Sequence, residues 1–278
     1  MFSNTLTLKG KIRRILSDCK TILFNLVNIK KKIFLNKSWN QVKSPKNLFA
    51  IIIATGPSFN KEIAKNILLK RKYFDLITIN YYCLNSFSKK LIPDYYLLSD
   101  PEQIEPSNNI VKKINKSIKK YISNPKIKFI CPYDDRWKIY KNPYLQFDDS
   151  QNLSSNNINP RNPRGYRSNT GMKAIATMLA LGYEKIFIVG FDYEYPRKII
   201  LDKNNKLLLL ENHNYGSQTI NINKDFSCVA HALHWWALDF WHLKKFKSKR
   251  IINVTKNSMI DVFARMSPEN FKQYIKQI

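Results

Sequence analysis

From residue 48 onward, short and continuously apolar runs alternate with longer stretches in which apolar residues recur at helical spacing. Continuous short runs are typical of strands buried on both faces, whereas helical spacing is typical of helices that cover a sheet. The pattern predicts strands over residues 48–54, 76–80, 95–99, 127–131, 185–189 and 250–254, and helices over 170–181 and 230–244. This alternation predicts an α/β fold, a Rossmann-like parallel sheet with helices on both faces.

Two stretches do not fit the alternation. Between residues 204 and 223 the periodicity fades into a polar segment. A long irregular connection in a compact domain is often a lid or a binding loop, so we expect a lid over about residues 204–223. The stretch 124–149 is interpreted as an insertion on the solvated surface, together with its acidic pairs Asp134, Asp135, Asp148 and Asp149.

Residues 1–46 form a basic arm ahead of a predicted catalytic domain over residues 47–278. The arm contains a single acidic residue, Asp18, among many lysines and arginines, and its apolar residues recur at helical spacing. Two structures fit this pattern: a basic amphipathic helix on anionic lipid, or a helix whose apolar stripe packs on the body. The apolar residues concerned are Leu8, Ile12, Ile15, Leu16, Cys19, Leu23 and Leu26. No apolar run is long enough for a membrane span, and no cleavable signal is recognisable.

The formal net charge of +27 requires an anionic partner, either nucleic acid, a membrane surface or anionic substrates. No nucleic-acid-binding module is recognisable, which argues against nucleic acid. The cysteines are scattered singly without metal-site spacing, as expected of reduced thiols in the cytoplasm. Whether the chain forms a homo-oligomer is left open. The four cysteines are Cys19, Cys83, Cys131 and Cys228.

The candidate binding motif is the turn after the first predicted strand, Thr55-Gly56-Pro57-Ser58. In open parallel sheets, ligands bind beyond the carboxyl ends of strands, and the first such turn often cradles a phosphate or nucleoside. Gly56 lets the backbone approach a ligand closely, and Ser58 is expected to cap the helix that begins near Asn60. The spacing matches neither a dinucleotide-binding fingerprint nor a P-loop.

Four later segments accompany that turn in a fixed order: Thr78-Ile79-Asn80-Tyr81-Tyr82, Arg167-Ser168-Asn169-Thr170-Gly171, Gly190-Phe191-Asp192-Tyr193 and Asn257-Ser258-Met259-Ile260. Together with the turn they resemble the bacterial sialyltransferases of glycosyltransferase family 42, which use CMP-activated sialic acid. The resemblance covers residues 49–268. It implies a GT-A-variant glycosyltransferase fold and an inverting, metal-independent transfer that needs no cofactor.

The resemblance also implies roles for individual residues. The turn, the second strand and the later segments would bind the CMP-sugar donor, and a histidine would be the general base. Histidine suits that role because it titrates near neutral pH, while Arg167 and tyrosine hydroxyls suit a departing phosphate. His234 is the alternative base. The implied catalytic residues are His231, Arg167, Tyr193 and Tyr195, and the implied substrate-binding residues are Thr55, Gly56, Ser58, Asn80, Asp100, Thr170, Gly190, Asn257 and Ser258.

Two departures from the family pattern bear on the donor sugar. Thr55 stands where the family has asparagine, and Asp100-Pro101 stands where it has asparagine and proline. A carboxylate at Asp100 would repel an acidic sugar unless it is protonated or paired. Sialic acid, another CMP-linked acidic nine-carbon sugar and CMP-Kdo therefore all stay open as donors.

Two other functions remain as alternatives. Asp192 and Glu194 form an Asp-x-Glu pattern at a strand end, which suits a metal-dependent transferase of a UDP- or GDP-sugar. A non-catalytic protein that binds an anionic polymer through the arm is the second alternative. We favour the CMP-sugar transferase, with a glycan of a bacterial lipopolysaccharide, lipooligosaccharide or capsule as acceptor. The expected location is the cytoplasm, peripherally on the inner face of the membrane.

Overall fold

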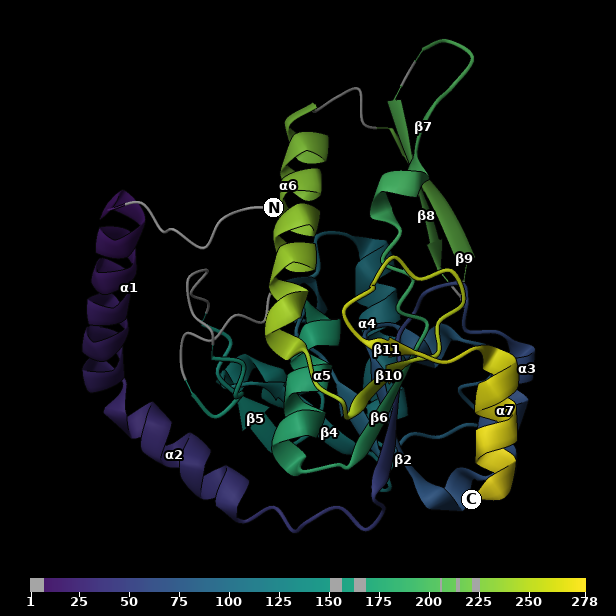
Figure 1. The fold of residues 1–278 in the computed structure, drawn as a ribbon, viewed down its shortest axis with the longest axis horizontal. Helices are drawn as coiled ribbons and strands as arrows, with labels where there is room; N and C mark the ends of the chain where they lie inside the picture. Colours follow the sequence, from purple (N-terminus) through teal and green to yellow (C-terminus); the bar gives the residue numbers. More distant parts are fainter. Residues whose placement is uncertain (1–7, 151–156, 163–168, 206, 214–215, 222–225) are drawn as a thin grey trace.

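The computed structural model describes residues 8–278 except 151–156, 163–168, 206, 214–215 and 222–225. Its centre is an eight-stranded sheet in which every neighbouring pair of strands is parallel (Figure 1). The strands are β1 (Phe49–Ile53), β2 (Phe74–Ile79), β3 (Tyr95–Leu97), β4 (Lys128–Pro132), β5 (Leu145–Phe147), β6 (Lys185–Val189), β10 (Ile251–Asn253) and β11 (Ala264–Arg265). The parallel α/β fold expected from the apolar runs is confirmed.

Successive side chains of β1 point to opposite faces of this sheet and enter two separate cores. Ala50 and Ile52 pack with α5 (Thr170–Leu181), and Ile51 and Ile53 pack in the core of the other face. That second face is covered by α3 (Lys61–Leu69), α4 (Asn109–Ile122) and α7 (Pro268–Gln277). Because both faces are covered, the central strands are mostly apolar, which is why their sequences read as continuous runs.

Short 3-10 helices complete the connections between these elements. They are η1 (Arg71–Tyr73), η2 (Tyr82–Leu84), η3 (Pro101–Gln103), η4 (Asp135–Ile139), η5 (Tyr195–Lys198) and η7 (Leu243–Phe246). Another long helix, α6 (Phe226–His242), leads directly into η7.

The strand order is β11-β10-β6-β1-β2-β3-β4-β5. The chain builds β1 to β5 successively in one direction, then returns to place β6 on the other side of β1, followed by β10 and β11. The boundary between β1 and β6 is therefore the topological switch point of the sheet. Ligands of open parallel sheets bind at the carboxyl ends of the strands at such a point.

The segment 204–223, expected to be irregular, is largely a β-hairpin, so that part of the prediction is wrong. β7 (Ile199–Leu201), β8 (Leu207–His213) and β9 (Gly216–Asn221) form a separate antiparallel sheet, seen at the upper right of Figure 1. β8 begins with four consecutive leucines, whereas β9 is largely polar and carries no long apolar run, so the pair did not read as two strands. Residues 206, 214–215 and 222–223 lie outside the described part, and a lid role stays a prediction.

The surface interpretation of residues 124–149 is also wrong in part. The stretch contains β4 and β5, and Asp148 is fully buried, with its carboxylate 2.7 Å from Lys31 Nζ. Asp149 pairs with the buried Lys173 at 2.7 Å. Asp135, in contrast, is 89% exposed, as expected. The lysines that neutralise Asp148 and Asp149 come from helices distant in the sequence, and no local sequence pattern reveals them.

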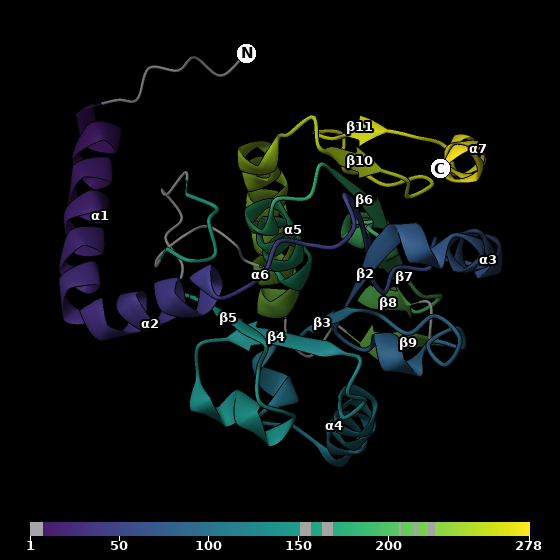
Figure 2. The ribbon, with the colours of Figure 1, turned by 90° about the horizontal axis from the view of Figure 1, so that it is seen from below.

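The basic arm consists of two helices that differ in their packing, α1 (Leu8–Val27) and α2 (Ile29–Asn40). α2 packs on β5 through the buried Leu35 and Trp39, and Trp39 Nε1 donates a hydrogen bond to the Gln146 carbonyl at 2.8 Å. α1 stands apart from the sheet and its covering helices (Figure 2). Within the part of the chain that the structure describes, no helix has the length and apolar character needed to cross a bilayer.

Candidate functional site

The turn after β1 lies at the switch point and is bonded to the end of β6. Ala54 N donates to the Val189 carbonyl at 2.9 Å, and Gly56 N donates to the Gly190 carbonyl at 3.1 Å. A Cβ atom on Gly56 would overlap both the Gly190 carbonyl oxygen and the Asp192 carboxylate. Glycine is therefore required here because the two loops approach each other closely, and the segments containing Gly56 and Gly190 form one corner of the site.

Ser58 binds the Asp192 carboxylate rather than a helix end. Its hydroxyl donates to Asp192 Oδ2 at 2.9 Å, and its backbone N–H points at the same oxygen at 3.5 Å. The helix is capped instead by Asn60, whose side chain accepts from the N–H groups of Glu62 and Ile63. The expectation that Ser58 caps α3 is wrong, because Asn60 adopts the extended conformation that an N-cap requires.

Asp192 is a buried carboxyl group at the centre of this corner. Only 8% of the residue is exposed, and burial is the main reason why its pKa is raised above the usual value near 3.8. The hydrogen bond from Ser58 acts in the opposite direction. A buried carboxyl with a perturbed pKa at the carboxyl edge of a parallel sheet is typical of a functional site.

The loop after β10 supports the loop after β6. Phe191 N donates to Thr255 Oγ1 at 3.0 Å, and the buried Ser258 hydroxyl donates to the Phe191 carbonyl at 2.6 Å. Asn257 is exposed and has a φ of 58°. Ser258 thus lies against the β6 loop as a positioning residue, and Gly190, with a φ of 74°, provides the left-handed turn that this loop needs.

The start of α5 joins the site through Asn169 and Thr170. The buried Thr170 hydroxyl shares a 2.9 Å hydrogen bond with Ser99, two residues after β3. Asn169 caps α5 and its amide donates to Tyr193 Oη at 3.0 Å and to Asp239 Oδ2 at 2.9 Å. Sequence reasoning assigned no role to Asn169 or Asp239. An asparagine just before a predicted helix is an N-cap signal, whereas Asp239 on α6 carries no such signal.

Asn80 directly follows β2, and its side-chain oxygen is a candidate contact for a ligand. Its φ is 51°, and its Oδ1 atom is buried without a hydrogen-bond donor among the described residues. A buried carbonyl oxygen left without a donor costs about 1–3 kcal/mol. A bound molecule with an N–H or O–H group would remove that cost.

Asp100 follows β3, and its carboxylate makes hydrogen bonds within the protein. Its carboxylate accepts from Glu102 N at 3.1 Å and caps η3. Burial, and after it the negative charge of Asp100, raises the pKa of the half-buried Tyr81 to about 12. Tyr81 therefore keeps its phenolic proton at neutral pH beside Asp100, a donor that sequence reasoning did not single out.

Several expected catalytic groups fall outside the described part. Arg167 is one of the residues that the structure does not describe, and His231 in α6 and Tyr195 in η5 are described only in their backbone. His234 is exposed on α6. His242, at the end of α6, is buried, and this burial together with Lys245 lowers its pKa to about 4, which makes it a weak base at neutral pH.

The Asp-x-Glu alternative has a limited ligand set. Asp192 directs one carboxylate oxygen at Ser58, and Glu194 follows two residues later. Among the residues that the structure describes, no group of three or more His, Cys, Asp and Glu side chains could hold a metal ion. Any metal at this position would need ligands from a substrate or from undescribed residues.

The comparisons with known proteins show the fold. No protein-family model matches the sequence, and no curated protein is significantly similar to it. Among solved structures, the chain is similar to the MAf glycosyltransferase from Magnetospirillum magneticum AMB-1, with 13% sequence identity and a TM-score of 0.51. The match covers 86% of this chain and 38% of that protein, so this chain spans well under half of the length of the MAf glycosyltransferase. The fold is thus shared with a glycosyltransferase.

Proposed function

We propose that this protein is an inverting glycosyltransferase that uses CMP-activated sialic acid or a related acidic nonulosonate. The observation that carries the proposal is the convergence at the β1–β6 switch point. There, the turn at Gly56 is bonded to the loop at Gly190, and Asn80, directly after the adjacent strand β2, offers a buried oxygen without a donor among the described residues. The amino group of a cytosine base is a donor that suits such an oxygen.

In the proposed reaction, an acceptor hydroxyl oxygen attacks the anomeric carbon of the donor sugar. A new glycosidic bond forms while the bond to the phosphate oxygen breaks, and its electron pair leaves with CMP. His231 takes the proton of the acceptor hydroxyl, and Arg167, Tyr193 and Tyr195 stabilise the charge that develops on the phosphate. The acceptor is a glycan of a bacterial surface polysaccharide or lipooligosaccharide.

Further support comes from the way Tyr193 is held. Its φ of 56° is unusual for a residue with a side chain, and its hydroxyl accepts from Asn169 while Trp236 Nε1 donates to its carbonyl at 3.1 Å. Strained backbone that is held by several partners is concentrated at binding and catalytic sites. Asn169 also contacts Asp239 on α6, the helix that carries His231.

The deciding experiment is a donor screen with CMP-, UDP- and GDP-sugars, with and without EDTA, on wild type, His231→Ala and His234→Ala. We expect transfer from a CMP-sugar only, unaffected by EDTA. His231→Ala should lose about 100-fold or more of the turnover while still binding CMP, and His234→Ala serves as the matched control on the same helix. A requirement for Mn²⁺ or Mg²⁺ with a UDP- or GDP-sugar would establish the metal-dependent alternative. Failure to bind any nucleotide sugar would leave the non-catalytic polymer-binding function.

A further inference from the structure

The helix α1 carries an apolar stripe that no other part of the described structure covers. Ile15 is 61% exposed, Leu23 is 62% exposed and Leu26 is 62% exposed. These positions recur at helical spacing and lie on one side of the helix. The large apolar residues that are exposed in α1 are Ile12, Ile15, Leu16, Ile22, Leu23, Leu26 and Val27.

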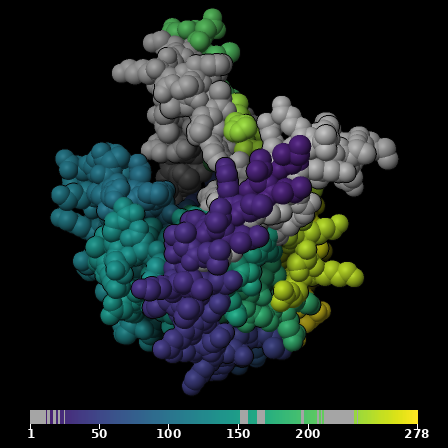
Figure 3. Space-filling model, turned by 90° about the vertical axis from the view of Figure 1, so that its left-hand side faces the viewer, coloured from purple at the N-terminus to yellow at the C-terminus, as the bar shows by residue number. Residues whose placement is uncertain are grey.

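The second arm helix explains why this stripe does not fold back onto the body. α2 is fixed to the body by three separate contacts: the Trp39 hydrogen bond to Gln146, the ion pair of Lys31 with Asp148, and the Phe34 ring, 5.0 Å from the ring of Tyr133. α1 meets α2 end to end at an angle (Figure 1). With α2 held in this way, α1 lies on the outside of the molecule, apart from the sheet and its covering helices (Figure 2 and Figure 3).

The charge on the arm defines the partner. Residues 8–40 contain one acidic residue, Asp18, among lysines and arginines. An exposed apolar stripe flanked by basic residues has the composition of helices that lie in the plane of an anionic bilayer. We propose that α1 binds the surface of an anionic lipid membrane, with its stripe among the acyl chains and its basic residues at the headgroups. This inference does not depend on the proposed enzymatic activity.

Other occupants of the stripe fit less well. A second copy of α1 would bury the stripe but would bring two lysine-rich surfaces together, and like charges at close range repel. A nucleic acid would satisfy the charge but leave the apolar residues in water. An anionic bilayer satisfies both features at once.

A matched comparison exists within the same chain, because α4 is also basic and amphipathic. It carries Lys112, Lys113, Lys116, Lys119 and Lys120. Its apolar residues Ile118 and Ile122, however, are fully buried against the sheet. If charge alone caused membrane binding, lysines on α4 would matter as much as those on the arm.

The test uses full-length protein and flotation with vesicles of phosphatidylcholine alone or with phosphatidylglycerol added. Wild type is expected to float only with the anionic vesicles. The variant Ile15→Asn/Leu23→Asn/Leu26→Asn should lose about tenfold or more of its partition coefficient, while Leu69→Asn, on a leucine of α3 that is 80% exposed, should stay within about twofold. Lys20→Gln/Lys30→Gln/Lys32→Gln should weaken binding more than Lys112→Gln/Lys113→Gln/Lys116→Gln.

Two results would overturn the proposal. Equal flotation of wild type and the stripe variant would show that the apolar residues do not enter the bilayer. A dimer in size-exclusion chromatography that the stripe variant converts to a monomer, without flotation of wild type, would assign the stripe to a second copy of the chain.

Discussion

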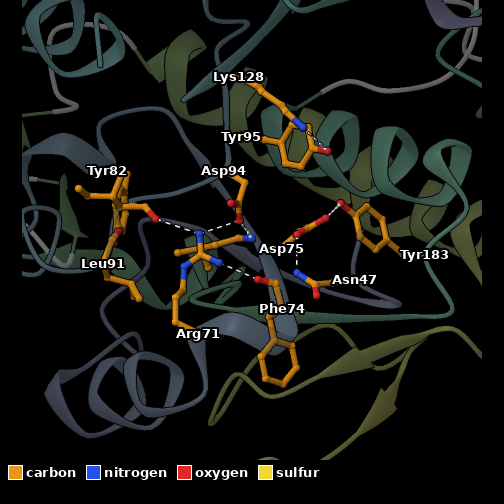
Figure 4. A network of polar contacts seen from close by, with 12 residues as sticks. Asn47, Arg71, Phe74, Asp75, Tyr82, Leu91, Asp94, Tyr95, Lys128 and Tyr183 are labelled. Carbon is orange, nitrogen blue, oxygen red and sulfur yellow. Dashed lines mark hydrogen bonds and ion pairs between the residues drawn. The ribbon is translucent and has the colours of Figure 1, made fainter. Parts of the chain in front are cut away.

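The two edges of the parallel sheet both hold buried or half-buried carboxyl groups, but they surround them differently. At the amino edge, Asp94 accepts from Leu76 N at 2.7 Å and pairs with Arg71 at 2.6 Å (Figure 4). Beside it, Asp75 accepts from the Asn47 amide at 2.7 Å and from the Tyr183 hydroxyl at 2.5 Å. At the carboxyl edge, Asp192 is held by the hydroxyl and the distant N–H of Ser58 and has a raised pKa.

We interpret this difference as one between carboxyl groups that stabilise the fold and a carboxyl group that belongs to the candidate site. The amino-edge carboxylates have strong fixed donors, so their burial is compensated within the fold. The carboxyl edge instead combines a desolvated carboxyl with left-handed backbone at Gly190 and Tyr193 and a turn that admits no side chain at Gly56. A fold tolerates such local cost where a ligand is to be bound.

The largest expected effect is that of Gly56→Ala. The new methyl group would overlap a backbone carbonyl as well as the Asp192 carboxylate, and a backbone cannot move aside cheaply. We expect the free energy of unfolding to fall by about 3 kcal/mol in urea titrations. The control is Gly182→Ala at the C-terminal end of α5. Its φ is positive, at 94°, but no atom lies within 4 Å of the added Cβ, so the expected loss in the free energy of unfolding is about 1 kcal/mol. Equal losses would contradict the tight contact at the switch point.

At the amino edge, Asp94→Ala is expected to lower the free energy of unfolding by about 2 kcal/mol. The change removes the acceptor of Leu76 N and leaves the half-buried Arg71 guanidinium without its carboxylate, although partial exposure reduces the loss. Asp135→Ala is the control, because that carboxylate is 89% exposed, and it should change stability by less than about 0.5 kcal/mol. Nucleotide binding per folded molecule should be unchanged, and a specific loss of it would place function at this edge as well.

The sequence predicted the strands with long apolar runs and missed some of the shortest strands. β1 and β6 appear as continuous apolar runs because helices cover both sides, and their turns could be expected to meet because carboxyl ends share an edge. β5 has three residues and β11 two, which is too short for a periodic signal.

The contacts that define the site were harder to predict than the sheet. Ser58 and Asp192 are 134 positions apart, and Asn169 and Asp239 are 70 apart. Local propensity does not specify such partners. Ser58 and Asn60 also show how two capping residues compete, since only the one with extended backbone at the helix start caps α3.

A smaller effect is expected from Asn60→Ala. Loss of the cap leaves the N–H groups of Glu62 and Ile63 without a side-chain acceptor and should cost about 1 kcal/mol of the free energy of unfolding. Asn66→Ala, inside the same helix, is the control and should change stability by less than about 0.5 kcal/mol, since alanine favours a helix interior. A loss with Ser58→Ala but none with Asn60→Ala would restore Ser58 as the cap.

The smallest stability effect, and the one of opposite sign, is expected from Asp192→Asn. Because the pKa of Asp192 is raised above 3.8 in the folded state, the folded protein holds this proton more tightly than the unfolded chain does. The stability that the protonated group contributes is therefore present below about pH 3.8 and is lost as the pH rises through the raised pKa. At pH 7 the ionised group opposes folding, whereas asparagine keeps the acceptor for Ser58 without charge. The free energy of unfolding of Asp192→Asn should therefore exceed that of wild type at pH 7, by up to about 1 kcal/mol.

The pH profile is what separates the two edges. Urea titrations of wild type and Asp192→Asn should differ at neutral pH and converge as the pH falls below about 3.8. Asp94→Asn, with the same change of charge, should be less stable than wild type at pH 7 because the ion pair with Arg71 is lost. If Asp192→Asn were destabilised at pH 7 as strongly as Asp94→Asn, Asp192 would be a stabilising group like its amino-edge counterparts. A variant that instead gains stability while losing transfer would identify Asp192 as a residue kept for function.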